Sequence, residues 1–397
     1  MAEITAQREP TQSPPVDATA PTTTVDSGRR RPPRLAALDG LRFLAALLVV
    51  FYHFVGSGGS GSAVWGVPAE RAFPHLSTVA AYCWTGVELF FLISGFVICM
   101  SSWNRTLGQF AISRATRLYP AYWFAVLATS AVLYFSPQVR QHLPFSQVIT
   151  NLTMLQEPLG VSPVDGVYWT LWVEMRFYLL FAIVVWRGVT YRRAMLFCCL
   201  WTVAAVIDAG LGDNKTLDYF AMPLFAPFFI GGVAFYLIYR FGSNALAWGI
   251  VVLSWVLSLY EIAISNRFNA EDLHRQLPAL PSQLAITAAF ALMAALALGW
   301  FSRFNWRFLT VLGATTYPLY LLHENIGWTV IAHLRKHVPH GLLAVGTALL
   351  MVLFAWAVQR FVEAPVARRL RTALNQGLAA MREAGRSETE ATATARE

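Results

Sequence analysis

The sequence predicts an all-α protein, a polytopic transmembrane bundle of about ten helices. Three observations lead to this fold class: 56% of the 397 residues are hydrophobic, only 13% are charged, and the mean hydropathy is +0.49. Such a composition leaves too much apolar surface for a water-soluble globule. Many of the 14 Trp and 27 Phe residues lie near the ends of apolar runs, as interfacial belts require.

Ten apolar runs divide the central part of the chain. Most approach the roughly 20 residues that a helix needs to cross about 30 Å of hydrocarbon. They lie at residues 38–55, 84–102, 118–136, 166–186, 194–210, 219–239, 245–263, 283–301, 310–332 and 342–361. The run near 146–155 is too short to span and is expected to be a loop.

The runs define a membrane domain over residues 35–371. Residues 1–34 are rich in Pro, Thr, Ala and Arg without apolar periodicity, which predicts a disordered tail, and residues 372–397 form a second, polar tail. No short apolar segment with a cleavage site is found at the N-terminus, so the first span is expected to direct insertion. No internal repeat of the transporter kind is evident.

The basic residues indicate an orientation. With both termini cytoplasmic, 21 of the 30 Lys and Arg residues fall inside and 7 outside, while Arg42 and Arg176 lie within spans. The positive-inside rule favours this arrangement and predicts a multi-pass protein of the cell membrane. A nucleic-acid-binding module would instead gather its charge on the polar face of a soluble domain, so we expect no nucleic-acid partner.

The four cysteines give no sign of a metal site or a disulfide framework. They lack CxxC spacing, and three of them lie within apolar runs. We therefore expect neither a bound metal nor a permanently bound cofactor.

Arg42 and His53 lie eleven residues apart in the first run. Titratable side chains inside spans are costly in lipid and usually face the protein interior, so they are candidates for function. Eleven residues make about three helical turns, which places the two on one face about 16 Å apart and lets them line one elongated cavity. The alternatives are that Arg42 is an anchor at the membrane surface and that His53 is a structural hydrogen-bonding residue.

Arg114 and Arg117 lie three residues apart in the segment SRATRLYPAYW, on what we expect to be a short helix leading into the third span. Guanidinium groups bind phosphates in a forked geometry, so this pair is a candidate phosphate site at the cytoplasmic face. The alternative is that both are topology signals.

Two later spans carry further polar stripes. In the fourth span, Thr170, Glu174 and Tyr178 follow at i, i+4 and i+8, on one face of a helix. Glu174 could orient a histidine, accept a hydrogen bond from a substrate or pair with an Arg, and a purely structural ion pair is the alternative. The ninth span gathers polar side chains that we expect to line a substrate cavity: Tyr317, Tyr320, His323 and Glu324.

The second span, with the segment WTGVELFFLISGF, contains another intramembrane acid. This residue, Glu88, could serve packing alone. Ser94 and Gly95, further along the same run, would let neighbouring helices approach closely.

Six of these segments, taken in order, resemble the acyltransferase 3 family of integral membrane proteins, which includes bacterial O-antigen O-acetyltransferases and macrolide acyltransferases. The segments are LDGLRFLAALLVVFYH, GVELFFLISGFV, SRATRLYPAYW, WTLWVEMRFY, TYPLYLLH and FVEAPVARR. The resemblance implies a ten-helix membrane domain that takes acyl-CoA from the cytoplasm. It also implies that His53 is the leading catalytic candidate and that four further residues are functionally important: Arg42, Arg114, Arg117 and Glu174.

On this hypothesis His53 is the general base that deprotonates an acceptor hydroxyl, because the ordinary pKa of histidine suits that task. The phosphates of coenzyme A bind near Arg114 and Arg117, and acetyl is the default acyl group. Some relatives append a secreted hydrolase-like domain, for which residues 372–397 are too few, so we expect the membrane domain to complete the transfer. Residue patterns do not distinguish among a surface polysaccharide, a glycolipid and a macrolide as acceptor.

Two other functions would also place His, Glu and Arg inside a bundle. A proton-coupled transporter predicts substrate flux without acyl-CoA. A nonenzymatic scaffold predicts that His53 can be replaced by Ala with function intact.

Overall fold

The computed structural model describes residues 35–211, 215–272, 276–303 and 306–394, and no strand occurs within these ranges. The tail expected at 1–34 lies outside the described residues. Within the described ranges, nine segments are long and apolar enough to cross a membrane. The prediction of an all-α transmembrane bundle is therefore confirmed.

The long helices follow the predicted apolar runs in order. They are α1 (Ala36–Phe51), α5 (Gly86–Ser102), α6 (Leu107–Phe135), α8 (Trp169–Trp186), α9 (Tyr191–Leu211), α11 (Ala226–Phe241), α12 (Ala245–Asp272), α13 (Ala279–Ala297), α14 (Arg307–Leu334) and α15 (His340–Val358). Among these, α14 is not one of the nine apolar segments, because its middle is rich in Thr, Tyr, His, Glu and Asn. Most of these polar side chains are buried inside the bundle.

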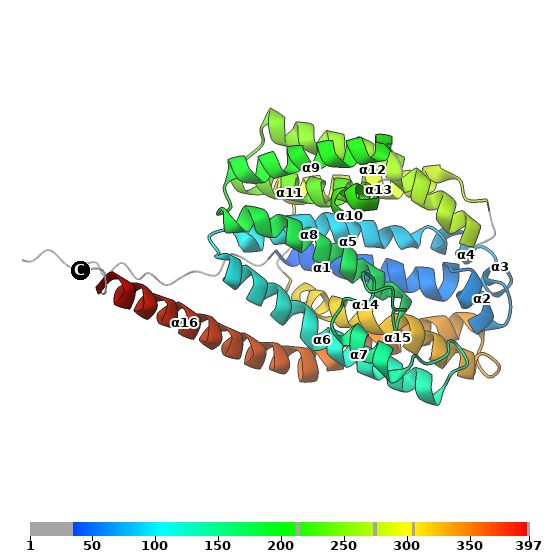
Figure 1. Ribbon diagram of the computed structural model, residues 1–397. Coiled ribbons are helices and arrows are strands. Elements are labelled where there is room, and N and C mark those ends of the chain that lie inside the picture. Colours follow the sequence, from blue (N-terminus) through cyan, green and yellow to red (C-terminus); the bar gives the residue numbers. More distant parts are fainter. Residues whose placement is uncertain (1–34, 212–214, 273–275, 304–305, 395–397) are drawn as a thin grey trace, which may run out of the picture. The chain divides into compact units, whose positions relative to one another are not determined.

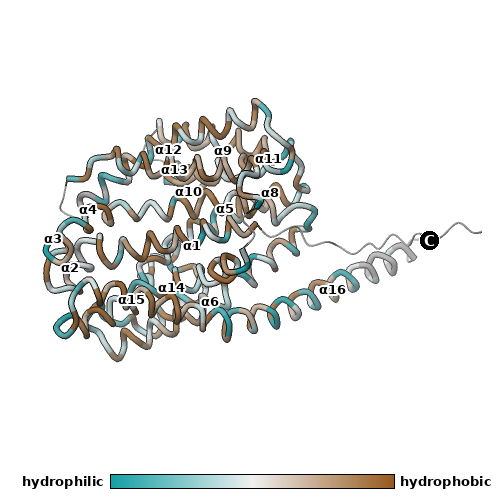
Figure 2. Tube along the Cα trace, turned by 180° about the vertical axis from the view of Figure 1, so that it is seen from behind, coloured by the Kyte–Doolittle hydropathy of each residue, from teal (hydrophilic) through white to brown (hydrophobic). Residues whose placement is uncertain are grey.

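The connections contain shorter helices: α2 (Gly59–Trp65), α3 (Ala69–Ala72), α4 (Leu76–Ala80), α7 (Phe145–Leu152) and α10 (Lys215–Ala221). The segment expected as a loop near 146–155 is thus mostly helical. The last helix, α16 (Ala364–Thr394), runs through residue 372, so the predicted boundary between domain and polar tail falls inside one helix. Figure 2 shows hydrophobic residues along the bundle helices and hydrophilic residues interspersed along α16.

Helices α1, α5 and α8 cross the middle of the bundle (Figure 1). On one side of them lie α9, α11, α12 and α13, and on the other lie α6, α14 and α15. The two sides therefore meet along α1 and α5.

Glycines permit the closest of these helix contacts. A Cβ atom on Gly95 of α5 would lie 2.1 Å from the Phe229 carbonyl oxygen of α11, and one on Gly232 would lie 2.0 Å from the Leu92 carbonyl oxygen. Only residues without a side chain allow two helix backbones to come this near. The expected close approach at Gly95 is present, and α11 is the partner helix.

Two local features of α1 and α6 position polar side chains. Regular α-helix ends at Phe51, and a π-helical turn, Tyr52–Gly56, follows and contains His53. Helix α6 begins at a capping box between Thr106 and Gln109 and continues without interruption through Pro120. Arg114 and Arg117 therefore lie within a 29-residue helix and not on a separate short one.

Candidate functional site

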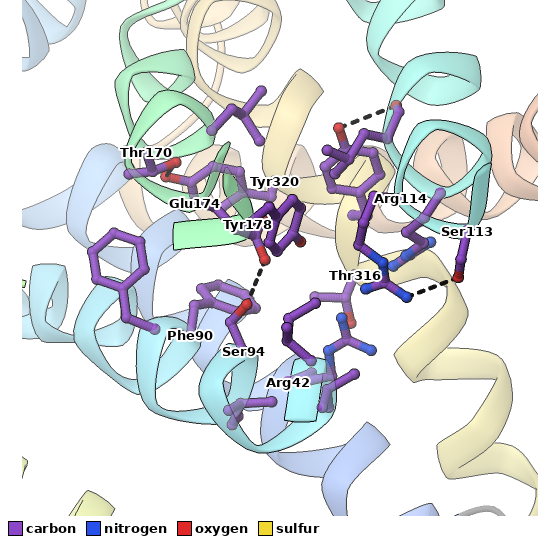
Figure 3. A pocket seen from close by; sticks show the side chains of 18 of the residues that line it. Arg42, Phe90, Ser94, Ser113, Arg114, Thr170, Glu174, Tyr178, Thr316 and Tyr320 are labelled. Atoms are coloured by element: carbon purple, nitrogen blue, oxygen red, sulfur yellow. Dashed lines mark hydrogen bonds between the residues drawn. The ribbon is translucent and has the colours of Figure 1, made fainter. Parts of the chain in front are cut away.

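A cavity of about 280 Å³ opens between α1, α5, α6, α8 and α14, and we call it the arginine cavity. Seven of the residues expected at the site line it: Arg42, Arg114, Arg117, Glu174, Tyr178, Tyr317 and Tyr320. Figure 3 shows Arg42 and Arg114 extending toward this space from different helices. Residues far apart in the sequence are thus brought together.

The arginines differ in how they are held. Arg42 makes no hydrogen bond or ion pair with any other described residue. The Arg114 guanidinium donates to Ser113 Oγ at 3.0 Å and Ser101 Oγ at 3.3 Å, and its buried Nε is without a partner among the described residues. Two cations without a carboxylate partner face a cavity, which is the arrangement that binds an anion.

Arg117 is held more firmly. Its guanidinium forms an ion pair with Glu363, 2.5 Å between Nη1 and Oε1, and lies 5.1 Å from the centre of the Tyr317 ring. Tyr317 in turn donates its hydroxyl to the Leu118 carbonyl oxygen at 3.2 Å. Arg117 therefore contributes positive charge to the cavity from a fixed position.

Sequence reasoning missed two residues near this cavity. Arg371 of α16 lines it and donates to Thr116 Oγ1 at 3.4 Å, and Glu363 pairs with Arg117. Both lie in or just after the FVEAPVARR segment, which was noted as a motif without roles for its charged residues. The pairing of an acid in this segment with a distant Arg leaves no signal in local spacing.

The stripe on α8 faces the arginine cavity as predicted, because Thr170, Glu174 and Tyr178 all line it. Glu174 Oε1 accepts a 2.6 Å hydrogen bond from Ser94 Oγ (Figure 3). Thr170 Oγ1 lies 2.9 Å from the Tyr320 hydroxyl. Arg176 lies elsewhere, donating to the Tyr219 carbonyl oxygen.

A second cavity, of about 410 Å³, contains His53, and we call it the histidine cavity. Its polar lining side chains include Tyr52, His53, Trp84, Glu88, Ser265, Asn269, Tyr320 and Glu324. Tyr320 and Val87 line both cavities and form the partition between them. The single elongated cavity expected from the spacing of Arg42 and His53 is therefore divided into two.

His53 and His323 form a hydrogen-bonded pair inside the bundle. His323 Nδ1 lies 2.9 Å from the Tyr320 carbonyl oxygen, and His53 Nδ1 lies 2.9 Å from the Val49 carbonyl oxygen. A nitrogen that faces a carbonyl oxygen must carry the proton, so both neutral rings are protonated on Nδ1. His323 Nε2, 3.0 Å from His53 Nδ1, then accepts from the same N–H, which it shares with the Val49 carbonyl oxygen.

This assignment leaves His53 Nε2 unprotonated, and it makes no hydrogen bond with a described residue. His53 therefore offers a lone pair on the side of the ring away from His323. The structure does not bring Glu174 to His53, since the two residues line different cavities and His323 occupies the place of the orienting group.

Glu324 interacts mainly with the segment that precedes α8. Its Oε2 accepts from the Val167 amide at 3.0 Å, and its carboxylate is so close to Gly166 that a Cβ there would lie 2.7 Å away. Burial, together with the Glu324 carboxylate, raises the pKa of Asp165 well above its usual range. Asp165, which sequence reasoning missed, also accepts from the Asn325 amide at 3.2 Å.

The arrangement combines a cationic cavity with a neighbouring base. The first suits a phosphorylated ligand, and the second suits proton abstraction from a group placed beside His53 Nε2. Among the described residues, no three His, Cys, Asp or Glu side chains are grouped to hold a metal ion.

Comparison with known proteins identifies relatives. A family model described as an acyltransferase domain matches residues 35–360. Acyltransferase MdmB of Streptomyces mycarofaciens is 27% identical over 189 residues, covering 45% of each chain. The exopolysaccharide production protein ExoZ of Rhizobium meliloti (strain 1021) is 34% identical over 122 residues, covering 29% of this chain and 37% of that protein.

A longer match is found with nodulation protein 10 of Rhizobium leguminosarum bv. viciae, which is 26% identical over 374 residues, 85% of this chain and 94% of that protein. The matches to MdmB and ExoZ span less than half of either relative. No solved structure is significantly similar.

Proposed function

Because the chain belongs to the acyltransferase 3 family of membrane acyltransferases, we propose that it moves an acyl group, acetyl by default, from acyl-CoA to a hydroxyl of a carbohydrate, glycolipid or macrolide acceptor. One observation carries the proposal: a cavity lined by four arginines adjoins, across Tyr320 and Val87, a cavity that contains a histidine with a free nitrogen lone pair.

The arginine cavity is the proposed donor site. Arg42, Arg114 and Arg371 bind the phosphates of coenzyme A, and Arg117, fixed by Glu363, adds to the positive field. The pantetheine arm then carries the thioester toward the partition. Acyl-CoA is a substrate in this scheme and not a permanently bound cofactor.

The histidine cavity is the proposed site of transfer. His53 Nε2 takes the proton of the acceptor hydroxyl as the oxygen attacks the thioester carbonyl carbon. The carbon–sulfur bond breaks, and the departing coenzyme A thiolate receives the proton from His53. The products are an acylated acceptor and coenzyme A with a free thiol.

The proposed acceptor classes draw support from relatives. One relative is named for exopolysaccharide production, which favours a carbohydrate, and another is named simply as an acyltransferase.

The distribution of basic residues supports an orientation in the cell membrane with both termini cytoplasmic, which places Arg42 nearer the cytoplasm than His53.

The test uses purified protein in lipid nanodiscs with radiolabelled acetyl-CoA. Methyl hexopyranosides, a lipid-linked sugar and a glycosylated macrolide serve as acceptors, and both coenzyme A release and labelled ester are measured. We expect His53→Ala to lower turnover by about 10²-fold or more. The matched control His333→Ala, in a residue that lines neither cavity, is expected to stay near wild type.

The donor site is tested in the same assay. Arg114→Ala is expected to raise KM for acetyl-CoA by about tenfold or more and to leave KM for S-acetylpantetheine, which lacks the nucleotide phosphates, nearly unchanged. Arg176→Ala removes a cation of α8 outside the cavity and serves as control. Wild-type turnover in His53→Ala would exclude His53 as base, and equal effects on both donors would exclude phosphate binding by Arg114.

A further inference from the structure

Glu88 carries a buried carboxyl group that the proposed transfer does not use. It lies in the first turn of α5, lines the histidine cavity and is only 5% exposed. Its Oε2 makes no hydrogen bond with any described group. A carboxyl group without a partner inside a membrane bundle is costly, so one that faces a cavity is suited to a ligand that supplies the missing hydrogen bond.

Trp84 has a buried hydrogen-bond donor without a partner in the described part of the chain, where Glu88 has an acceptor without one. It precedes Glu88 by four residues, lines the same cavity and is 8% exposed, and its indole N–H is buried without an acceptor among the described residues. Two residues that line this cavity, four apart in the chain, thus have between them one unpartnered donor and one unpartnered acceptor within the described ranges. A hydroxyl group, which donates and accepts at once, satisfies both.

The remaining lining indicates what kind of molecule carries this hydroxyl. Trp169, Phe225 and Tyr52 add aromatic surface, and Asn269 and Ser265 add uncharged polar groups. No Arg or Lys is found among the described lining residues, in contrast to the arginine cavity. Aromatic faces pack against the C–H faces of sugar rings, while carboxyl, amide and indole groups take their hydroxyls.

We propose that the histidine cavity binds an uncharged pyranose ring, with Glu88 and Trp84 holding one hydroxyl while a neighbouring hydroxyl faces His53. This inference rests on the proposed acyl transfer and narrows its acceptor to a sugar with at least two free hydroxyls. Glu88 accepts from the held hydroxyl and Trp84 donates to it, so an acceptor lacking this group leaves both unsatisfied. An anionic sugar is disfavoured because the cavity also contains Glu324.

The experiment measures acceptor KM, acetyl-CoA KM and kcat in nanodiscs, since detergents with sugar headgroups would compete for the cavity. The acceptors are the methyl α-pyranosides of glucose, galactose and mannose, their monodeoxy derivatives, and methyl glucuronopyranoside. Glu88→Met keeps the length of the side chain but removes its hydrogen bonds, and Trp84→Phe removes the N–H. We expect each to raise acceptor KM at least tenfold with acetyl-CoA KM unchanged, and Glu88→Gln to recover part of the loss.

The monodeoxy series identifies the held hydroxyl. One derivative is expected to be a poor acceptor for wild type yet to be used equally by wild type and Glu88→Met. The matched control Glu261→Met alters a carboxyl group that is also 5% exposed but lines neither cavity, and its acceptor KM is expected to stay at the wild-type value.

Each result decides between the two proposals. Acceptor KM within twofold of wild type in both Glu88→Met and Trp84→Phe would overturn the sugar subsite and leave acyl transfer standing. Absence of coenzyme A release with every acceptor would instead overturn the proposed function on which the subsite rests.

Discussion

At the scale of single residues, the hydrogen bond between His53 and His323 has the clearest chemical meaning. His323 is fully buried, and two backbone carbonyl oxygens, those of Leu319 and Tyr320, lie within 3.2 Å of its Nδ1. They hold the ring in the tautomer that accepts from His53. We expect His323 to act as a positioning residue, through His53, and not on substrate directly.

Replacement of His323 tests this role. His323→Leu removes the acceptor and is expected to lower kcat about tenfold or more, with KM for acetyl-CoA unchanged, because His53 loses its orientation. His323→Gln places a carboxamide oxygen near the former Nε2 and is expected to restore part of kcat. If Leu and Gln lowered kcat equally, or if both raised KM for acetyl-CoA, a general packing role would explain His323 better.

Helical spacing predicted which residues of one helix share a face, but it did not predict which residues of other segments contact that face. It placed Thr170, Glu174 and Tyr178 together, and all three line one cavity. It could not separate Arg42 from His53, because the residues that divide the space between them, Val87 and Tyr320, come from other helices. The contacts of Arg371 and Asp165 depend on packing between segments more than a hundred residues apart, which local patterns do not contain.

At the scale of elements, the contact of α5 with α11 supports the site. Gly95, where the two backbones meet, is adjacent to Ser94, whose hydroxyl donates to Glu174 of α8. The position of α5 therefore fixes one wall of the arginine cavity and, through Glu88, part of the histidine cavity. A change in the packing of α5 against α11 would therefore also move Ser94 and Glu88 in the two cavities.

Gly95→Ala is expected to lower both stability and activity. The added Cβ would lie 2.1 Å from a backbone oxygen, which cannot move aside as a side chain could. Overpacking of this kind costs about 1–3 kcal/mol or more. Thermal unfolding followed by tryptophan fluorescence should show a lower midpoint for Gly95→Ala, while Gly249→Ala in α12, with no atom within 4 Å of its Cβ, should remain close to wild type or rise. Equal midpoints would contradict the tight contact.

Apolar runs located every long helix of the bundle from α1 to α15, because length and hydropathy are properties of contiguous sequence. Even α14, whose centre is polar, falls on a predicted run, at residues 310–332. The helical character of 145–152 and of 372–394 was missed because neither segment is a long apolar run. Helix α16 packs along α6, where Arg382 donates to Thr106 Oγ1, and this contact between distant segments is invisible in the local composition.

At the scale of the whole molecule, the sorting of basic residues leads to a testable topology. The loop between α14 and α15 contains Arg335 and Lys336 and is expected outside, while α16 is expected on the cytoplasmic side. A reporter active only in the cytoplasm should therefore work when fused after residue 397 and fail when fused after residue 337. A periplasmic-type reporter such as alkaline phosphatase should give the reverse pattern, and the opposite result at both sites would invert the orientation.

The partition formed by Tyr320 and Val87 has a consequence for the membrane that contains the enzyme. On the proposed topology the arginine cavity lies nearer the cytoplasm than the histidine cavity, and a continuous wet path through both would let protons leak down the membrane potential. Each elementary charge that crosses dissipates about 2.3 kcal/mol per 100 mV. The Tyr320 side chain, whose hydroxyl lies 2.9 Å from Thr170 Oγ1, and Val87 stand between the two cavities and interrupt this path. A partition that stays closed to water would thereby keep the cell's ion gradients intact while both cavities are in use.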